Sequence, residues 1–390
     1  MQLRVLLLIG LVYAAFPSRA AETQAEKAAP SVRKLRDITI YSDDKFYCAF
    51  PSIVVRRDGE LIVAFRRAPE RRAFGETGIT HTDANAYLML TRSTDSGQTW
   101  SAPELLFAHP LAGSQDPCMV QLKDRSLICT SYAWAWVQMS AIEKMKQAVH
   151  YGNFVFLGGY LLRSEDDGHH WEGPISPAPC EGETAHDIYG QPVPAYNRGA
   201  MCEGKDGRLY WVVASNTSTN SRQTETHLMI SGDKGRTWKY SCPIAKEEKF
   251  SINETSLYQT PKGDLVAFMR TEGFNDHTIV ARSTDNGRSF EHWTDSGFQG
   301  HPHHAIQLPD KRVLLVYGYR HVPYGVRARV LDAESTRFDS PEIVLRDDGG
   351  NGDLGYPWAT LISRKRALVV YYFNKQDKVR HIAGTFLEIE

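Results

Sequence analysis

The stretch that decides the fold is Ser93-Thr-Asp-Ser-Gly-Gln-Thr-Trp100, because its pattern returns three more times. The further copies are Ser164-Glu-Asp-Asp-Gly-His-His-Trp171, Ser231-Gly-Asp-Lys-Gly-Arg-Thr-Trp238 and Ser283-Thr-Asp-Asn-Gly-Arg-Ser-Phe290. In each copy the Asp can accept backbone N–H bonds within a tight turn, and the Gly can take the positive φ that the turn requires. The final aromatic residue can anchor the returning strand in the core. Four copies in register predict a repeated β-structure.

The segments between these turns form a second repeated unit. Each contains an apolar strand, a polar or glycine-containing turn and another apolar strand, rich in Val, Leu, Ile and Tyr. The six hairpins lie at residues 52–65, 119–130, 200–214, 256–269, 305–317 and 358–372. With a strand pair after each hairpin, we predict an all-β fold, a six-bladed β-propeller of four-stranded antiparallel blades. A β-sandwich also has many short strands, but it would not place four such turns in phase.

The two ends of the predicted propeller are expected to meet. The short strand at residues 37–41 should pair with a strand near residues 379–387, which closes the ring and removes its open edges. We therefore expect one propeller domain over residues 36–390. The hydrophobic content of 42% and charged content of 23% are those of a soluble globular protein. A formal net charge of −1 offers no global basic surface to nucleic acid, and we expect a monomer.

The first twenty residues differ from the rest. Arg4 precedes an apolar run from Val5 to Phe16, and small residues stand before a cut after Ala20. This layout is typical of a secretory signal peptide over residues 1–20, followed by a flexible tether over residues 21–35; a buried N-terminal helix is the alternative. The apolar run is short for a bilayer span, and no other run reaches that length. The prediction is a secreted or periplasmic protein without a membrane span.

Six cysteines are present, and export would permit disulfides. Cys118 and Cys129 flank a predicted turn at residues 123–126 and are the first pair to test, with buried free thiols as the alternative. No CxxC or zinc-ligand spacing occurs, so neither a metal nor another cofactor is predicted. The cluster His301-Pro-His-His304 could bind a metal only with a further ligand that the sequence does not identify.

The repeated turn is identified as the Asp-box, and the chain resembles bacterial sialidases over most of residues 37–390. Sialidases carry an active-site Glu followed by an Arg that binds the substrate carboxylate, and Glu254 and Arg270 match this pair. Tyr356, between Gly355 and Pro357, matches the nucleophilic Tyr of the last blade. Asp116 matches the start of the second blade, and the resemblance implies a role in substrate binding.

The resemblance also implies an arginine from the fifth blade. Arg327 is the first choice, with Arg329 and Arg320 as alternatives. A third arginine is missing, because the first blade reads Ala49-Phe50-Pro51 where sialidases have an Arg-Ile-Pro type sequence. This departure weakens the assignment of sialic acid as the substrate.

Other arginines could replace the missing one. They are Arg66, Arg67, Arg71 and Arg72 near the end of the first hairpin, and Arg198 at the opening of the third blade. A guanidinium can hold a carboxylate with two parallel bonds, which Lys does less well. For the four arginines of the first blade, a solvated basic loop is the alternative.

The general acid of the resembled mechanism is an Asp before the first Asp-box. His81 falls nearest to that position, and Asp83 lies two residues on. In an extended segment, residues two apart face the same side, so both could point into the centre of the ring.

These residues favour a secreted glycan-cleaving enzyme that acts on a terminal acidic sugar, so the expected partner is a glycan with a carboxylate-bearing sugar. In the mechanism that the resemblance implies, Tyr356 is the nucleophile, Glu254 accepts its proton, and Asp83 or His81 protonates the leaving oxygen. The expected substrate-binding residues are Arg270, Arg327, Arg66, Arg67, Arg198, Asp116, His303 and His304.

Two other functions stay open. The first is a hydrolase or lyase of uronic-acid glycans, such as rhamnosyl-glucuronate, that uses histidine, with His81, His186 or the His301–His304 cluster as the acid or base. A structural hydrogen-bonding role is the alternative for each of these histidines. The second is a non-catalytic glycan-binding propeller, since Asp-box propellers also occur as binding modules.

Overall fold

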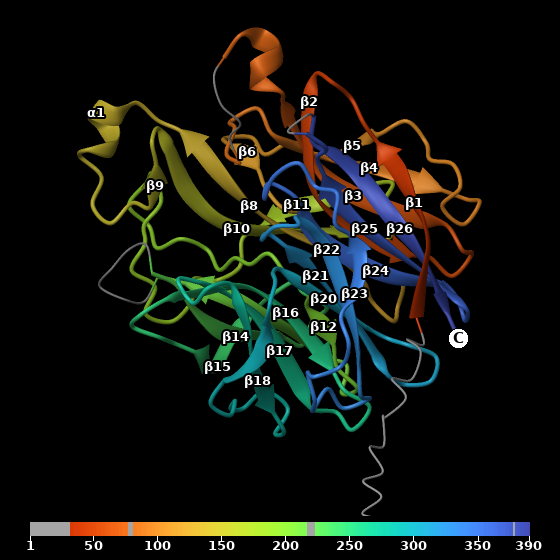
Figure 1. The fold of residues 1–390 in the computed structure, drawn as a ribbon. Coiled ribbons are helices and arrows are strands. Elements are labelled where there is room, and N and C mark those ends of the chain that lie inside the picture. Colours follow the sequence, from red (N-terminus) through yellow and green to blue (C-terminus); the bar gives the residue numbers. More distant parts are fainter. Residues whose placement is uncertain (1–31, 77–80, 217–222, 377–378) are drawn as a thin grey trace, which may run out of the picture.

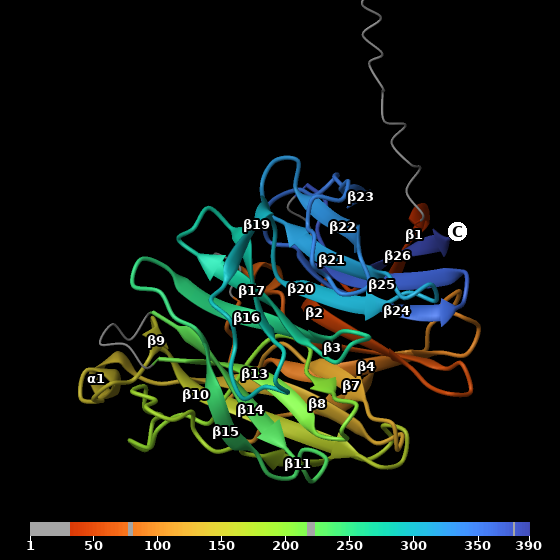
Figure 2. The same cartoon turned by 90° about the horizontal axis from the view of Figure 1, so that it is seen from below.

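The computed structural model describes residues 32–76, 81–216, 223–376 and 379–390. Within them the chain forms six antiparallel sheets, which Figures 1 and 2 show from two directions. Five sheets have four strands, and one has two additional short strands. The predicted all-β propeller of six blades is confirmed.

The innermost strand of blades 1, 3, 4 and 5 is the first of that blade in sequence, whereas in blade 6 it is Gly355–Ser363 and the first strand in sequence, Val32–Tyr41, is the outermost. Blade 1 contains β2 (Phe46–Val55), β3 (Leu61–Pro69), β4 (Tyr87–Ser93) and β5 (Glu104–Phe107). Blade 2 contains β6 (Gly113–Ser114), β7 (Cys118–Gln121), β8 (Leu127–Trp136), β9 (His150–Tyr151), β10 (Phe154–Ser164) and β11 (Glu172–Ile175). Blade 3 contains β12 (Cys202–Glu203), β13 (Leu209–Ser215), β14 (Glu225–Ser231) and β15 (Lys239–Ala245).

Blade 4 contains β16 (Ser251–Gln259), β17 (Leu265–Glu272), β18 (His277–Ser283) and β19 (Thr294–Gln299). Blade 5 contains β20 (His303–Gln307), β21 (Val313–Tyr319), β22 (Gly325–Leu331) and β23 (Ile343–Arg346). Blade 6 contains β24 (Gly355–Ser363), β25 (Arg366–Phe373), β26 (His381–Ile389) and β1 (Val32–Tyr41). The described helices are the 3₁₀ helix η1 (Arg71–Phe74) and α1 (Met139–Ile142).

The ring closes through blade 6. β1 pairs antiparallel with β26, from Val32 opposite Ile389 to Tyr41 opposite Ile382, which confirms the predicted closure. β1 begins at Val32, before the predicted domain start at residue 36. The predicted signal peptide and most of the predicted tether lie outside the described residues. In the described part of the chain, no helix is long and apolar enough to cross a membrane.

The core lies between blades rather than at the centre of the ring. Six clusters of buried apolar side chains each join neighbouring blades. For example, Leu61 and Val63 of blade 1 pack with Leu368 and Val370 of blade 6. Because apolar side chains of each blade are buried against its neighbours, the hydrophobic effect holds the ring together and leaves its centre to polar groups.

The Asp-boxes form the same turn in blades 1 to 4. In the first, the Ser93 hydroxyl donates to Asp95 over 2.8 Å, and the backbone N–H of Thr99 donates to Asp95 over 2.9 Å. Hydrogen bonds from Thr99 lower the pKa of Asp95 to about 2. Gly97 has a φ of +83°, and a Cβ there would lie 3.2 Å from Phe386 of blade 6. Each box is therefore a rigid turn pressed against the preceding blade.

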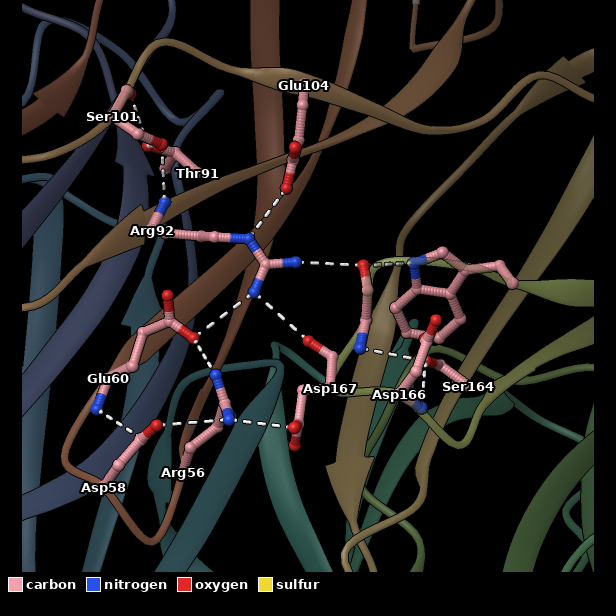
Figure 3. A network of polar contacts seen from close by, with 12 residues as sticks. Arg56, Asp58, Glu60, Thr91, Arg92, Ser101, Glu104, Ser164, Asp166 and Asp167 are labelled. Atoms are coloured by element: carbon pink, nitrogen blue, oxygen red, sulfur yellow. Dashed lines mark hydrogen bonds and ion pairs between the residues drawn. The ribbon is translucent and has the colours of Figure 1, made fainter.

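An arginine of blade 1 clamps the Asp-box of blade 2 (Figure 3). Arg92 donates to the carbonyl oxygens of Asp167 at 3.2 Å and Gly168 at 2.9 Å. The same guanidinium pairs with Glu60 at 3.3 Å and with Glu104 at 2.8 Å. These bonds join blade 1 to the next blade at the periphery of the ring.

Blade 5 contains a fifth turn of this kind that lacks the box sequence. Asp332 accepts the backbone N–H groups of Thr336 and Arg337, both over 2.9 Å, and Ser335 takes the place of the glycine with a φ of +51°. Arg282 of blade 4 donates to the carbonyls of Glu334 and Ser335 over 2.6 and 2.9 Å. The clamp between blades 4 and 5 thus repeats the one between blades 1 and 2.

All six cysteines lie in the described residues, and all are free thiols. Cys118 in β7 and Cys129 in β8 are buried on adjacent strands, where burial raises the pKa of both thiols. Each of the two cysteines is therefore a small apolar side chain in a core between blades.

Candidate active site

Three innermost strands carry the same irregularity. β2, β16 and β24 each have a bulge against the next strand, and in each bulge a non-glycine residue has a positive φ. These residues are Phe50 at +57°, Glu254 at +38° and Tyr356 at +53°. A bulge redirects a side chain, and left-handed backbone at a bulky residue is strained by about 1–3 kcal/mol. The three bulges direct side chains of blades 1, 4 and 6 toward one another.

Tyr356 and Glu254 are directly hydrogen-bonded. The Tyr356 hydroxyl donates to Glu254 Oε1 over 2.6 Å. Arg270, in β17 opposite the bulge, lies 2.6 Å from Glu254 Oε2 and donates to the Tyr356 oxygen over 3.2 Å. Glu272 holds the other end of the guanidinium at 2.8 Å. The three residues predicted from separate parts of the sequence therefore form one cluster.

The charges around this cluster determine which of its groups carries a proton. Burial and the Glu254 carboxylate raise the pKa of Tyr356 well above its ordinary value, so its hydroxyl keeps its proton at neutral pH. Burial by itself raises the pKa of Glu254, but the Arg270 guanidinium and the Tyr356 hydroxyl outweigh burial and hold that pKa below its ordinary value. The pair consists of a neutral phenol that donates to an ionised carboxylate.

Two more guanidinium groups lie against the Tyr356 ring. Those of Arg198 and Arg320 are each 5.0 Å from its centroid. Arg320 also donates to the Tyr372 hydroxyl over 2.9 Å, and Arg198 donates to the Tyr356 carbonyl over 3.3 Å. With Arg270, three guanidinium groups therefore surround the Tyr356 phenol.

The segment before β12 holds Glu254 in place. The Asn197 side chain donates to the Thr255 carbonyl over 2.7 Å and accepts the Thr255 backbone N–H over 3.2 Å. Gly199 follows, and a Cβ there would lie 2.0 Å from the same carbonyl oxygen. Asn197 and Gly199 thus fix the strained bulge from blade 3.

Asp116 and Arg66 lie buried near this cluster without hydrogen bonds. Among the described residues, neither oxygen of Asp116 and no guanidinium nitrogen of Arg66 has a hydrogen-bond partner. Burial and the nearby Glu254 carboxylate raise the pKa of Asp116 to about 6. Arg66 is fully buried, and its guanidinium lies 5.5 Å from the centroid of the Tyr47 ring.

The two residues predicted as alternative acids have different surroundings. Asp83 is buried, and Arg71 holds both of its oxygens at 2.7 and 2.9 Å. His81 is half exposed, stacks on Phe50 at 5.7 Å, and lies 3.3 Å from Asp353. The expectation that both face the same side rested on an extended segment, but Asp83 accepts the backbone N–H of Asn85 and opens a turn.

Two other predicted arginines bond to groups outside the Tyr356 cluster. Arg67 donates to the hydroxyls of Tyr87 and Tyr41 over 2.9 and 3.2 Å. Arg327, in the third strand of blade 5, pairs with Glu342 at 3.3 Å and donates to the Pro323 carbonyl over 3.0 Å. Arg320, in the segment between β21 and β22, is the fifth-blade arginine that contacts Tyr356 instead.

Two of the clustered histidines take part in the hydrogen bonding of the blades. His303 is paired with the Thr278 hydroxyl at 2.7 Å, and His304 accepts the Ala359 backbone N–H over 3.2 Å while stacking on Trp358. Burial lowers the pKa of each to about 3, so both are neutral. His301 lies 3.5 Å from Asp276. Among the described residues, no three His, Cys, Asp or Glu side chains form a set that could hold a metal ion.

A cavity of about 520 Å³ opens beside Glu254, and its aromatic wall was not predicted from the sequence. We name it the aromatic pocket, and its ring-bearing wall consists of Tyr132, Trp134, Phe156 and Tyr196. Glu254 and Arg198 line the same cavity. The signal in the sequence was Tyr132-Ala-Trp-Ala-Trp136, in which period-two alternation puts three rings on one face of β8 and the alanines on the other.

Comparison with known proteins places these features in a family context. A family model described as BNR repeat-like domain matches residues 145–368. A solved protein of unknown function from Dyadobacter fermentans DSM 18053 is 54% identical, over 93% of this chain and 100% of its own, with a TM-score of 0.90. No curated protein matches the chain.

Two solved sialidases share the fold. The NanB sialidase of Streptococcus pneumoniae is 15% identical over 92% of this chain and 70% of its own, with a TM-score of 0.61. The sialidase of Trypanosoma rangeli, solved with sialic acid, is 16% identical over 93% of this chain and 59% of its own, with a TM-score of 0.59. At such identities the likeness concerns the fold alone.

Proposed function

The chain belongs to the family of BNR repeat-like domains, and on that premise we propose that it is an exo-glycosidase that removes a terminal acidic sugar through Tyr356 and Glu254. The observation that carries the proposal is the 2.6 Å hydrogen bond from the Tyr356 hydroxyl to Glu254. A phenol of high pKa becomes a nucleophile only if a base takes its proton during attack, and Glu254 is an ionised base in direct contact.

The reaction follows from this contact. The Tyr356 oxygen attacks the anomeric carbon, its proton passes to Glu254, and the glycosidic C–O bond breaks. The leaving oxygen takes a proton from an acid. Water then attacks the anomeric carbon and gives one proton to that deprotonated acid, while the glycosyl–tyrosine bond breaks and Glu254 returns its proton to the Tyr356 oxygen. A sialidase with a Tyr nucleophile is a known exception to the usual two-carboxylate glycosidase.

We assign the acid to His81 rather than Asp83. Arg71 donates to both oxygens of Asp83, at 2.7 and 2.9 Å, so this carboxyl is engaged by a guanidinium and not free to contact a leaving oxygen. His81 is half exposed, and its Nε2 lies 3.3 Å from the Asp353 carboxylate, which can orient the ring. The Phe50 ring joins it to the site, since Phe50 contacts both His81 and Tyr356.

The acidic group of the sugar is assigned to Arg270 and Arg320. Both guanidinium groups lie at Tyr356, one in hydrogen-bond contact with its oxygen and one over its ring. Carboxylate binding at this place would set the anomeric carbon of the sugar near the nucleophile. Ala49 supplies no third guanidinium, so we propose an acidic sugar without restricting it to sialic acid.

The proposal is tested by release of sugar from acidic glycans. The wild-type protein should liberate sialic acid or a uronic acid from a panel of terminal sialosides and uronosides. Tyr356→Phe should lower kcat by at least about 10³-fold, because it removes the nucleophile. Tyr240→Phe, in the outer strand β15, is the matched control and should keep full activity. No release by the wild type from any member of the panel would sink the proposal.

A second function, a lyase of uronic-acid glycans, is favoured by one observation. His81 is half exposed beside Asp353, as a histidine that abstracts a proton would be. A lyase creates an unsaturated uronate that absorbs in the ultraviolet, and a hydrolase does not. Appearance of that absorbance, with loss of it in His81→Ala but not in Tyr356→Phe, would replace the hydrolase proposal by the lyase.

A further inference from the structure

Basic side chains gather at one end of blade 6, on the side that faces blade 1. The strands β25, β26 and β1 pair so that Glu388 stands between Arg366 and Arg33, and Glu388 forms its ion pair with Arg33. The exposed basic residues of this end are Arg33, Arg36, Arg364, Lys365 and Arg366. Because the side chains of Glu388 and Glu390 can offset only part of this charge, the end of the blade is positive.

A β-bulge brings one of these arginines to the side that faces blade 1. Lys34 faces blade 5, where it donates to the Leu345 carbonyl over 2.6 Å. The next two residues, Leu35 and Arg36, stand opposite the single residue Phe386 of β26, as in a bulge. The Arg36 guanidinium consequently lies over the Phe386 ring, 4.5 Å from its centroid.

A cavity of about 590 Å³ lies between this end of blade 6 and the Asp-box of blade 1. We name it the basic pocket, and its lining includes Arg36, Arg366, Phe386 and Ile362. The Asp-box supplies the opposite wall, because Gly97 packs on Phe386 and leaves its exposed neighbours Ser96 and Gln98 in the lining. The lining from the described residues therefore contains two guanidinium groups and no carboxylate.

The lining suits a sugar that carries a negative charge. Among the described residues, neither Arg36 nor Arg366 has an acceptor for its guanidinium, and a guanidinium can hold a carboxylate or sulfate through two parallel bonds. Phe386 and Ile362 offer an apolar surface to the C–H groups of a sugar ring. The Gln98 amide nitrogen donates to the Asp95 carbonyl over 3.1 Å, so its oxygen is left to accept from a hydroxyl.

The basic pocket and the Tyr356 cluster lie at opposite ends of blade 6. Tyr356 is the second residue of β24, and Ser363, which lines the pocket, is the last. At about 3.3 Å per strand residue, roughly 20 Å separate the two along β24. Figure 1 shows the C-terminus at the end of the blade that holds the pocket, where Val32 of β1 pairs with Ile389. A sugar unit in the basic pocket therefore does not contact Tyr356.

We propose that the basic pocket is a second, non-catalytic site that binds an acidic oligosaccharide, with Arg36 and Arg366 on the carboxylate or sulfate groups of one sugar unit. The other basic residues of this end extend beyond the pocket and suit further acidic units of the same chain. An anionic membrane is the other polyanion that a basic face can bind. Of the apolar residues that line the pocket only Leu35 is exposed, at 38%, so this face offers little to insert into lipid.

The binding test uses two acidic hexasaccharides, an oligogalacturonate and a heparin fragment, with maltohexaose as the neutral probe. In calorimetry the wild-type protein should bind at least one acidic probe, more weakly at high salt because salt screens the charges, and should not bind maltohexaose. Arg36→Gln/Arg366→Gln, at two exposed positions, should weaken this binding at least tenfold. Arg288→Gln/Arg337→Gln removes two exposed arginines from the corresponding turns of blades 4 and 5, and as the matched control it should change the affinity less than twofold.

A further variant separates the basic pocket from the centre of the ring. Arg320→Gln, which alters the proposed catalytic centre, should keep the binding that Arg36→Gln/Arg366→Gln loses. The reverse result, equal losses in Arg36→Gln/Arg366→Gln and its control, or no binding of either acidic hexasaccharide by the folded wild type would overturn the inference. Binding to phosphatidylglycerol vesicles without binding to the soluble glycans would also overturn it and make this face a membrane-binding one. Because the test measures no turnover, a failure to cleave any glycan would overturn the proposed function alone.

Discussion

Replacing Arg92 by Met tests the clamp between blades 1 and 2. Met keeps the aliphatic stem but removes the donors to the Asp167 and Gly168 carbonyls, together with the ion pairs to Glu60 and Glu104. Hydrogen bonds made by a charged group contribute about 1.5–3 kcal/mol each, and water can replace part of this at the periphery of the ring. Because Glu104 is half exposed, its ion pair adds little. We therefore expect a loss of about 2–4 kcal/mol in the free energy of unfolding.

The assay is urea denaturation followed by tryptophan fluorescence, with calorimetry for the melting temperature. An unfolding entropy of about 2 cal/mol/K per residue makes each 1 kcal/mol worth about 1 °C in a chain of this size, so Tm should fall by about 3–5 °C. Arg282→Met, which removes the corresponding clamp onto Glu334 and Ser335, should have a similar effect.

Arg236→Met is the matched control for the clamp. Arg236 also reaches a neighbouring blade, but it is half exposed, and its partners Glu165 and Glu172 are more exposed still. Its loss should cost at most about 1 kcal/mol. If Arg92→Met and Arg236→Met lower the free energy of unfolding equally, the bonds to the turn carbonyls add no stability beyond that of an exposed ion pair, and the reasoning is refuted.

Three further predictions follow from the buried groups. The Asp116 carboxyl has a pKa of about 6 in the folded protein, above its ordinary 3.8, so the wild type loses stability as pH rises from about 4 to about 6. Asp116→Asn does not ionise, so its stability relative to the wild type should rise over that range and then level off. Tm measured against pH for both proteins checks this, and parallel curves would contradict it. Gly159→Ala should displace Tyr196 and lower Tm, because the new Cβ would overlap the Ala195 carbonyl; an unchanged Tm would show that the close approach of the two backbones is dispensable. Denatured, unreduced protein should react with six equivalents of a thiol reagent, since all six cysteines are free; a count of four, with Cys118 and Cys129 protected, would indicate a disulfide.

The fold could be predicted from the sequence because its determinants are local. An Asp, a Gly and an aromatic at fixed spacing encode a turn, and alternating apolar residues encode the strands that it joins. The turn at Asp332 was missed because Ser335 takes the positive φ that elsewhere falls to Gly. A non-glycine residue adopts this conformation only when the surrounding structure imposes it. Neither the turn propensity of Ser nor the spacing of residues in the sequence predicts such a constraint.

The clustering of Tyr356, Glu254 and Arg270 could be predicted because the resemblance fixed the first two on innermost strands and the third on the strand paired with one of them. It was not predictable where the chain leaves its strands. Arg327 and Arg320 are close in sequence, but only the segment between β21 and β22 carries its guanidinium to Tyr356. The aromatic pocket needed three separate segments, in β8, β10 and the chain before β12, and no spacing rule connects them.

The pairing of β1 with β26 also sets an order for folding. Asp37 of β1 bonds to Thr385 of β26 across 348 residues, so β1 is synthesised long before its partner strand. Blades 1 to 5 are each formed by consecutive strands and can assemble as they emerge, whereas blade 6 cannot be completed until the late strand is free. Until then β1 is an unpaired strand edge, open to association with other chains. Shielding of this early segment during synthesis should therefore govern the yield of native protein, and point changes in Val32–Tyr41 should affect that yield more than they affect the stability of the finished ring.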